Sequence, residues 1–416
     1  MASAAEPTTE KAVLRNRWWI VVASVLGLLV GTGSILILNF GVFMKPVTEE
    51  LGWSRGAFSA ALLVQGVGGI ISAPIFGRML DRYGIRRASL PMIAVLALAV
   101  ASLSMLNGSL WLLYLIFFIA SMGGPTQGPL TYSKAISAWF DKERGLALGI
   151  ATAGSGIGAI LIPLESQYLI DVFGWRMAYI GLAITNFVIA FSIFAFVLRD
   201  PPGHVRSPGE SATRGAGPAG MAPRDALRSW RLWSITAIFT IGGIAINGTL
   251  AHVAALLNDR GIPPDAAAIV LSSSGITIII GRIFGGWLLD RLFAPYVGGA
   301  VLLLPAIGCA LLAAGFTGWV PTLAVLLCGA GLGVELDMMG FFVSRYFGIR
   351  SFGEIYGYMF VGFAIGVGIG PVMMGRDFDV TGSYTIALWS FTVLLVIAAF
   401  LSARLGAYAF PKAAVS

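Results

Sequence analysis

The sequence predicts an all-α integral membrane protein with twelve transmembrane helices in two pseudo-symmetric halves of six helices each. Three observations predict this fold class: the composition, the recurrence of apolar segments, and two loop motifs that each occur twice. The chain has 416 residues, of which 57% are hydrophobic and 11% are charged, and its mean hydropathy is +0.86. Soluble proteins rarely reach such values, so a lipid bilayer is the expected surrounding.

Apolar segments of about twenty residues recur along the whole chain. At 1.5 Å per residue, a helix of that length crosses a hydrocarbon core of about 30 Å. The sequence predicts twelve such helices, at about residues 18–43, 57–77, 88–106, 110–134, 145–168, 176–198, 232–257, 266–289, 296–315, 320–345, 353–375 and 384–407.

The lysine and arginine residues of the short loops predict the orientation. They fall before the first helix and after helices 2, 4, 8 and 10, whereas alternate loops such as LNGS at 106–109 and TGWVP at 317–321 are nearly uncharged. Because positively charged loops stay in the cytoplasm, both termini are expected there, in the inner membrane of a bacterium. No cleavage site follows the first apolar segment, so it is expected to be retained. The net charge of +7 is therefore a topology signal and does not indicate nucleic-acid binding.

A stretch rich in Pro, Gly, Ser and Arg at residues 199–231 lacks apolar periodicity and divides the chain in two. Such a composition is typical of a flexible linker. The expected organisation is a cytoplasmic segment 1–17, a six-helix bundle 18–198, the cytoplasmic linker 199–231, a second six-helix bundle 232–407 and a cytoplasmic tail 408–416.

Two loop motifs of the first bundle return in the second. GRMLDR at 77–82 matches GWLLDR at 286–291 at an offset of 209 residues, and WFDKERGLALG at 139–149 matches YFGIRSFGEIYG at 346–357 at an offset of 207 or 208. Two matches at nearly one offset indicate duplication of a six-helix unit.

The loop GRMLDRYGIRR at 77–87 closely resembles the loop motif of the major facilitator superfamily. Within it, FGVFMKPVTEELGWSRGAFSAA at 40–61 and the WFDKERGLALG loop resemble the group of monocarboxylate transporters and oxalate:formate antiporters. The resemblance covers nearly the whole chain. It implies the major facilitator fold and transport of small carboxylates through a central cavity by alternating access.

The repeated motif supplies candidate gating residues, Gly77, Asp81 and Arg82 after helix 2 and Asp290 and Arg291 after helix 8. Asp81 can pair across the interface of the two halves at the cytoplasmic gate and stabilise the outward-open state. The alternative is that these charges only anchor helix ends at the lipid headgroups.

Arg282 is the strongest candidate for substrate binding. It stands eight residues before Asp290, hence about 12 Å inside the bilayer, where an unpaired cation costs about 3 kcal/mol. Its planar fork of donors matches a carboxylate. The resemblance implies the same role, because in that group an arginine of helix 8 binds the substrate carboxylate. The alternative is a structural ion pair with Glu335 or Asp337.

Three positions depart from the relatives. Phe363 takes the place of a second cation of the oxalate:formate antiporter, which makes a dicarboxylate substrate less expected. Ile278 and Leu38 take the places of an acid and a lysine of the animal monocarboxylate transporters. The proton-coupling residues of those relatives therefore cannot be transferred to this chain.

Three other residues are candidates for proton coupling because arginine does not titrate. His252 has an ordinary pKa near neutrality and could also donate to the substrate, unless it is a neutral structural histidine. Glu335 and Asp337 are two residues apart, hence about 200° around a helix, so only one can face the transport path. We expect Asp337 to be that residue.

Polar residues of other helices could complete the substrate site. Gln127 and Tyr132 in helix 4 and Asn39 in helix 1 are candidates, with hydrogen bonding between helices as the alternative for each. Cys309 and Cys328 lack metal-ligand spacing and are expected to be buried hydrophobic residues.

These features predict a proton-coupled symporter of small monocarboxylates such as lactate or pyruvate, with Arg282 pairing the carboxylate. Its expected partners are the substrate, protons and the bilayer, with no nucleic acid, and a monomer is expected. An anion antiporter of the oxalate:formate type and an efflux pump for hydrophobic compounds are the alternatives. An enzyme is not expected, because the two histidines, His204 and His252, form neither a metal cluster nor a pair with a nucleophile, and no cofactor is expected.

Overall fold

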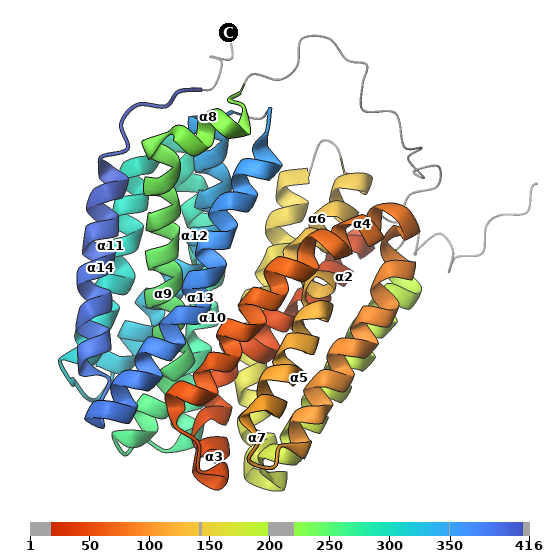
Figure 1. Cartoon of the computed structure of the whole chain (residues 1–416), viewed down its shortest axis with the longest axis vertical. Coiled ribbons are helices and arrows are strands. Elements are labelled where there is room, and N and C mark those ends of the chain that lie inside the picture. The colour runs from red at the N-terminus through yellow and green to blue at the C-terminus, as the bar shows by residue number, and fades with distance from the viewer. Residues whose placement is uncertain (1–17, 141–143, 199–219, 349, 411–416) are drawn as a thin grey trace, which may run out of the picture.

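The computed structural model describes residues 18–140, 144–198, 220–348 and 350–410. Within these ranges the regular structure is helical, apart from one isolated bridge between Gly220 and Gly348. The helices follow one long axis and form two groups that lie side by side, the first half of the chain in red to yellow and the second in green to blue (Figure 1). The predicted all-α architecture is therefore confirmed.

The first half contains both the longest helices and the most interruptions. Its elements are α2 (Trp18–Leu29), η1 (Gly33–Leu38), α3 (Phe40–Leu51), α4 (Arg55–Ser102), η2 (Leu103–Met105), α5 (Leu110–Gly123), η3 (Gly124–Gln127), α6 (Pro129–Trp139), α7 (Arg144–Ser192) and η4 (Ile193–Val197).

The second half is more regular. Its elements are α8 (Pro223–Arg228), α9 (Trp230–Asp259), α10 (Pro264–Arg291), α11 (Ala294–Ala313), α12 (Val320–Tyr346), α13 (Phe352–Thr381) and α14 (Thr385–Ala403).

Two glycines divide the longest helices into separate membrane crossings. Gly84 in α4 and Gly174 in α7 have φ values of 77° and 78°, which a helix does not contain. Around Gly174 the chain reverses, because Thr185 donates a hydrogen bond of 2.6 Å to Glu165 on the other side of the turn. The apolar stretch Ala147–Val197 thus makes two crossings. With the ten other apolar spans of the described residues, it gives the twelve crossings that the sequence predicts.

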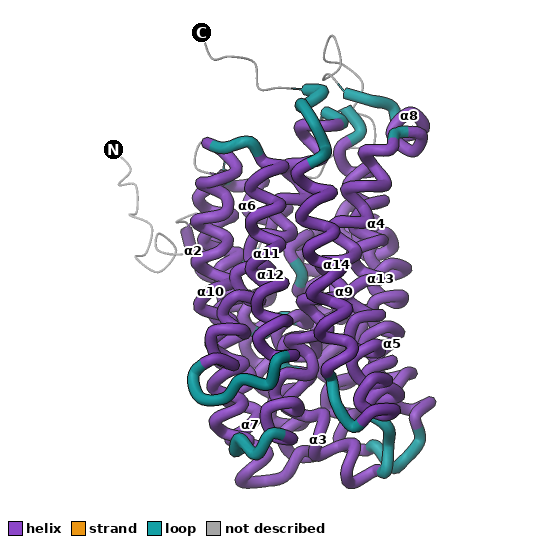
Figure 2. Tube along the Cα trace, turned by 90° about the vertical axis from the view of Figure 1, so that its left-hand side faces the viewer, coloured by secondary structure: helices purple, strands orange, loops and turns teal. Residues whose placement is uncertain are grey.

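The molecule has two ends along its long axis. The helix α8 and the segment 404–410 lie at one end, which we call the terminal face (Figures 1 and 2). The end of α3 lies at the opposite end, which we call the distal face. The predicted segment 1–17, residues 199–219 of the predicted linker and residues 411–416 of the predicted tail lie outside the described residues. The domain boundaries stay predictions.

The two halves meet chiefly along two helix pairs, α4 with α13 and α7 with α10, and α3 also contacts α9. Glycine permits the close approach at the second pair. A Cβ atom on Gly275 of α10 would lie 2.4 Å from the carbonyl oxygen of Gly156 in α7, and a Cβ atom on Gly156 would lie equally close to Cγ1 of Ile279. Backbones at this distance leave no room for side chains, so these two positions fix how tightly the halves can close.

Candidate functional site

Arg282 lies on the face of α10 that meets the first half of the molecule. On this face Gly275 and Ile279 precede it by two turns and by one turn, and both pack against Gly156 of α7. Arg282 follows them toward the terminal face, where its side chain is partly exposed. Its Nε atom is buried and has no hydrogen-bond partner among the described residues. A cation thus lies between the halves, one turn beyond this close contact, with a donor still unpaired.

Asp337 lies beside Arg282 because α10 and α12 pack closely in one register. A Cβ atom on Gly333 of α12 would lie 2.4 Å from the carbonyl oxygen of Ile278 in α10. Four residues further along both helices, the same register brings Asp337 to Arg282. The two charges interact electrostatically, yet no direct ion pair joins them in the part of the chain that the structure describes. Asp337 is exposed, so the space beside both groups is open to a ligand or to water.

Tyr356 of α13 is the third polar member of this site. Its ring approaches Gly340 of α12, one turn beyond Asp337, with a distance of 4.0 Å from Cε2 to a Cβ position on that glycine. Its hydroxyl interacts electrostatically with both Arg282 and Asp337. A cation, an acid and a phenol from three helices therefore share one location.

Glu335 faces a different way from Asp337, as the helical geometry predicts. Its side chain is 2% exposed and lies against α9, where a Cβ atom on Gly242 would be 2.1 Å from Oε1. Neither carboxyl oxygen has a hydrogen-bond partner among the described residues. Of the two acids, only Asp337 lies next to Arg282.

In the structure Gln127, Tyr132 and Asn39 each contact other residues of the first half. Gln127 exchanges hydrogen bonds with Asn186 of α7, at 2.7 and 3.4 Å. Tyr132 is 1% exposed and fills the space over Gly27 of α2. These two contacts are of the kind expected if the polar residues stabilise packing between helices of one half.

Asn39 occupies the junction between η1 and α3. Its Nδ2 atom donates a hydrogen bond of 2.8 Å to Ser166 of α7, and its side chain is fully buried. This contact also lies within the first half. A role of Asn39 in substrate binding stays a prediction.

The repeated loop motif lies at the terminal face. Gly77 has open space around its Cβ position. The guanidinium of Arg82 lies 5.4 Å from the centre of the Tyr83 ring, and that of Arg291 lies 4.3 Å from the Trp287 ring. Asp290 is exposed at the end of α10. The side chain of Asp81 lies outside the described structure, so its pairing across the halves stays a prediction.

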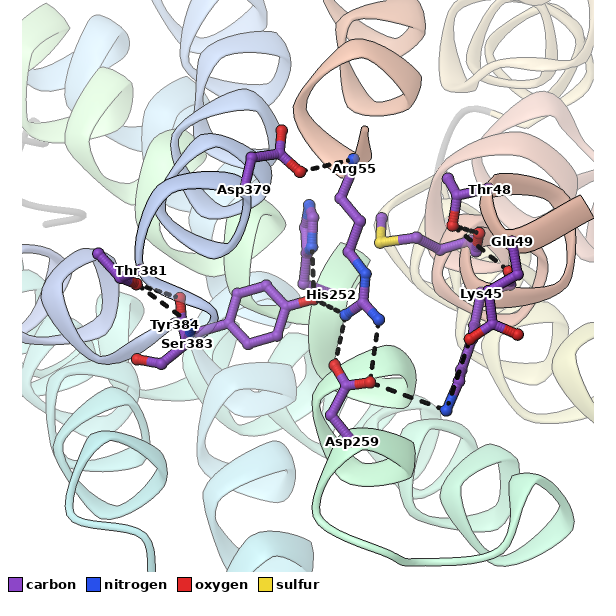
Figure 3. Close-up of polar contacts among 11 residues, drawn as sticks. Lys45, Thr48, Glu49, Arg55, His252, Asp259, Asp379, Thr381, Ser383 and Tyr384 are labelled. Carbon is purple, nitrogen blue, oxygen red and sulfur yellow. Dashed lines mark hydrogen bonds and ion pairs between the residues drawn. The ribbon is translucent and has the colours of Figure 1, made fainter. Parts of the chain in front are cut away.

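A second polar cluster joins the halves near the distal face (Figure 3). Arg55, at the start of α4, is almost fully buried and forms a two-pronged ion pair with Asp259 of α9, of which the Nη2–Oδ1 contact measures 2.9 Å. Its Nη1 atom also donates to the hydroxyl of Tyr384, and its guanidinium lies 3.8 Å from the ring centre of Phe378. Every face of this arginine is thus occupied by the second half.

The backbone of the same helix end is also held from the other half. Asp379 of α13 accepts hydrogen bonds from the N–H groups of Arg55 and Gly56, at 2.9 and 2.8 Å. The first N–H groups of a helix lack partners within it, and a carboxylate there is stabilised by the helix dipole. Lys45 of α3 adds a weaker contact, 3.8 Å from Asp259.

His252 belongs to this distal cluster. Its Nε2 atom donates a hydrogen bond of 2.8 Å to the carbonyl oxygen of Pro371 and lies 2.9 Å from the hydroxyl of Ser59. Its Nδ1 atom lies 3.5 Å from the hydroxyl of Tyr384. Pro371 follows Tyr356 by fifteen residues, or about 22 Å along α13. The structure therefore places His252 in the distal cluster and not beside Arg282, and its roles in substrate binding and proton coupling stay predictions.

Sequence reasoning missed the distal cluster. Arg55, Asp259 and Asp379 stand at the ends of predicted helices, where charges are ordinarily taken for loop residues. One signal was present, because the loops of this face carry acids together with single basic residues, such as Arg55, Arg176 and Arg260. An arginine facing isolated acids on one side of a membrane protein is a candidate for an ion pair.

Two curated proteins show the sequence relationship. The oxalate:formate antiporter of Oxalobacter formigenes is 29% identical over 193 residues, which cover 45% of this chain and 44% of that protein. Monocarboxylate transporter 11 of Homo sapiens is 28% identical over 267 residues, which cover 60% of this chain and 54% of that protein. The aligned regions thus span about half of each relative.

The fold relationship extends over nearly the full length. A crystal structure of the nucleoside transporter NupG superposes with a TM-score of 0.75 over 94% of this chain and 99% of that chain, at 14% sequence identity. Residues 22–371 match the Major Facilitator Superfamily, a family of transporters. With two groups of helices, twelve crossings and this match, the chain belongs to the Major Facilitator Superfamily.

Proposed function

We propose that the protein is a proton-coupled symporter of small monocarboxylates, in which Arg282 binds the carboxylate and Asp337 carries the proton. The observation that carries this proposal is the unpaired Nε atom of Arg282, partly exposed between the halves and beside a single acid. The names of the two curated relatives, a monocarboxylate transporter and an oxalate:formate antiporter, favour an anionic substrate.

The guanidinium of Arg282 suits a carboxylate because both groups are planar. Two parallel N–H donors can meet two oxygens at once, and such charge-assisted bonds are stronger than neutral ones. A cation within the bilayer lacks the hydration that it would have in water. An incoming carboxylate would restore the missing interactions, so its binding energy is concentrated at this residue.

Asp337 links the substrate to a proton by competition. An ionised Asp337 and an ionised substrate would both need Arg282, and two anions beside one cation repel each other. A proton on Asp337 removes that repulsion and leaves the guanidinium to the substrate. Proton binding and substrate binding therefore favour each other, which is the thermodynamic requirement for symport.

Glu335 is the second candidate for the proton. Its buried carboxyl group has no hydrogen-bond partner among the described residues. It lies on a different face of α12 from Asp337. His252 is a weaker candidate because its ring is bound within the distal cluster.

Transport requires that the site open alternately to the two sides. In this conformation the contacts of the distal cluster hold the halves together at one end, so exchange with solvent would occur at the terminal face. We infer that this face is cytoplasmic, because the lysine and arginine residues of the loops concentrate there. On this basis the protein is a monomeric carrier of the bacterial inner membrane with both termini inside.

Uptake of labelled lactate and pyruvate into proteoliposomes, with and without an inward proton gradient, tests the proposal. Arg282→Ala should lower gradient-driven uptake by at least about a hundredfold. Arg282→Lys should lower it by about tenfold, because lysine keeps the positive charge but cannot donate two parallel hydrogen bonds to a carboxylate. Arg404→Ala, which removes an exposed arginine at the end of α14, is the matched control and should leave uptake unchanged. Equal uptake by native protein and Arg282→Ala would exclude the binding role.

Asp337→Asn separates proton coupling from substrate binding. The amide cannot release a proton, so we expect the variant to exchange external for internal substrate while losing accumulation driven by the proton gradient. Glu335→Gln serves as the paired variant, and loss of coupling in it alone would move the proton site to that residue. Native protein that exchanges anions but ignores the gradient would indicate antiport instead.

A further inference from the structure

We propose that the Arg282 site takes aromatic monocarboxylates, such as phenylacetate or benzoate, in preference to the small aliphatic acids. This inference rests on the proposed function, since it assumes that Arg282 binds a carboxylate. It is carried by a row of aromatic rings on α13 that begins beside Arg282.

Four aromatic side chains follow each other along one face of α13. The ring centres of Phe352 and Tyr356 are 5.9 Å apart with an interplanar angle of 20°, and those of Tyr356 and Phe360 are 6.2 Å apart at 16°. Phe363 continues the row, 5.9 Å from Phe360 at 42°. The spacing of four, four and three residues keeps all four rings on the same side of the helix.

The packing of α13 shows that this side faces the space between the halves. Gly362 and Gly366 pack against α9, and Gly368 packs against Leu63 of α4 in the first half. Around the helix, Phe360 lies between these two contact faces. Val361 and Ile365, which point the other way, are exposed on the outer surface.

The second ring of the row, that of Tyr356, lies near the charged groups of Arg282 and Asp337. Tyr356 interacts electrostatically with Arg282 and Asp337, so a carboxylate on the guanidinium would lie close to it. Phe360, one turn deeper, is 39% exposed, whereas Phe363 is only 7% exposed. An exposed phenyl ring beside a polar site, inside a membrane protein, offers a surface that a substrate ring can cover.

The size of the substrate follows from this arrangement. Lactate and pyruvate place one methyl group beyond the charged end, which cannot cover the ring of Phe360. A phenyl group attached at or near the carboxylate can extend along α13 and pack in the offset or edge-to-face manner that aromatic rings favour. A second carboxylate would meet this apolar row instead of a cation, which disfavours dicarboxylates.

Uptake of labelled phenylacetate, benzoate, lactate and pyruvate into proteoliposomes tests the preference. For native protein we expect kcat/KM to be about tenfold higher for the aromatic acids. Phe360→Leu should lower kcat/KM for phenylacetate by about three- to tenfold and change that for lactate by less than about twofold. Phe360→Tyr, which keeps the ring, should retain the preference, and Phe187→Leu on the outer face of α7 is the matched control.

The lactate rate reports folding of each variant, so a loss of phenylacetate uptake alone cannot be a folding defect. Uptake that depends on Arg282 but is equally fast for both classes, or an aromatic preference that survives Phe360→Leu, would overturn this inference and leave the proposed function in place. Absence of Arg282-dependent uptake for all four acids would overturn the proposed function, and this inference with it.

Discussion

The two polar clusters between the halves each centre on an arginine, and they differ in how completely it is paired. Arg55 at the distal face has a carboxylate, a hydroxyl and an aromatic ring around its guanidinium. Arg282 has an unpaired Nε atom and interacts with Asp337 and Tyr356 without an ion pair to either in the described residues. A satisfied cluster can hold the halves together by itself, whereas an unsatisfied one gains most when a ligand arrives. We therefore propose that Arg55 helps to hold the halves together and that Arg282 binds the substrate.

The largest expected effect breaks the distal cluster. Asp259→Asn leaves Arg55 buried without a charge partner, which costs about 3 kcal/mol and so shifts the balance between closed and open distal faces by about a hundredfold. In a protein carrying Ser59→Cys, a membrane-impermeant maleimide applied from the distal side should react correspondingly faster. Asp265→Asn, at an exposed site near the same face, is the control. Equal rates in the two variants would argue against the cluster as a closure.

A comparison of matched substitutions sharpens the contrast between the arginines. Arg55→Met should lower the free energy of unfolding by about 3 kcal/mol, because it removes the two-pronged ion pair and leaves Asp259 only the weaker contact with Lys45. Arg282→Met should change stability by less than about 1 kcal/mol while abolishing uptake, because it removes a cation that lacks a full set of partners. Thermal unfolding in detergent measures both. Similar losses of stability would mean that Arg282 is a structural residue.

Steric crowding at the interface of α7 and α10 should have a smaller effect. Gly275→Val introduces side-chain atoms where a Cβ would already lie 2.4 Å from a carbonyl oxygen of the other half. Overpacking of this kind costs about 1–3 kcal/mol, so the distal face should open more often, by about tenfold. The rate of maleimide labelling at Ser59→Cys measures how often the distal face opens. Gly286→Val, on the same helix but with open space around it, should label like the parent protein.

The smallest expected effect concerns an ion pair between Glu50 and Arg176. Both residues belong to the first half, so this pair does not cross the interface between the halves. Hydrogen bonds from Arg176 and Trp175 hold the pKa of Glu50 below its ordinary value of 4.5. This stabilisation is present above that value and is lost as the pH falls through the lowered pKa. The drop in melting temperature between about pH 7 and about pH 4 should therefore be slightly smaller in Glu50→Gln. An unchanged drop would show that this pair does not contribute.

Hydrophobic length made the fold predictable, because every crossing must match the thickness of a bilayer. All twelve predicted crossings are present, but helix ends with polar residues were cut short: α3 runs to Leu51 and α13 to Thr381, beyond the predicted ends at 43 and 375. Hydropathy detects only the apolar part of a helix, and these ends carry charges outside it.

Site residues were predictable where a charge stood in an apolar run, as for Arg282. Which way a side chain points depends on how each helix is rotated, and a single sequence does not contain that information. For this reason the sequence did not foretell that Gln127 bonds to Asn186 or that Tyr132 covers Gly27, and their roles in substrate binding stay predictions. The choice of Asp337 over Glu335 as neighbour of Arg282 agrees with the contacts of α10 and α12.

The close contact of α10 and α12, which glycines of α12 permit, also has a consequence for the direction of transport. A Cβ atom on Gly329 would lie 2.5 Å from the carbonyl oxygen of Ser274, and Gly333 makes the same kind of contact one turn later. Helices interlocked at this distance move as one body, so Arg282 and Asp337 keep their mutual geometry whichever side they face. If this pair binds the substrate and the proton as proposed, it presents the same two charged groups to both sides of the membrane. The carrier would then be reversible, running inward or outward as the concentrations of acid and proton dictate.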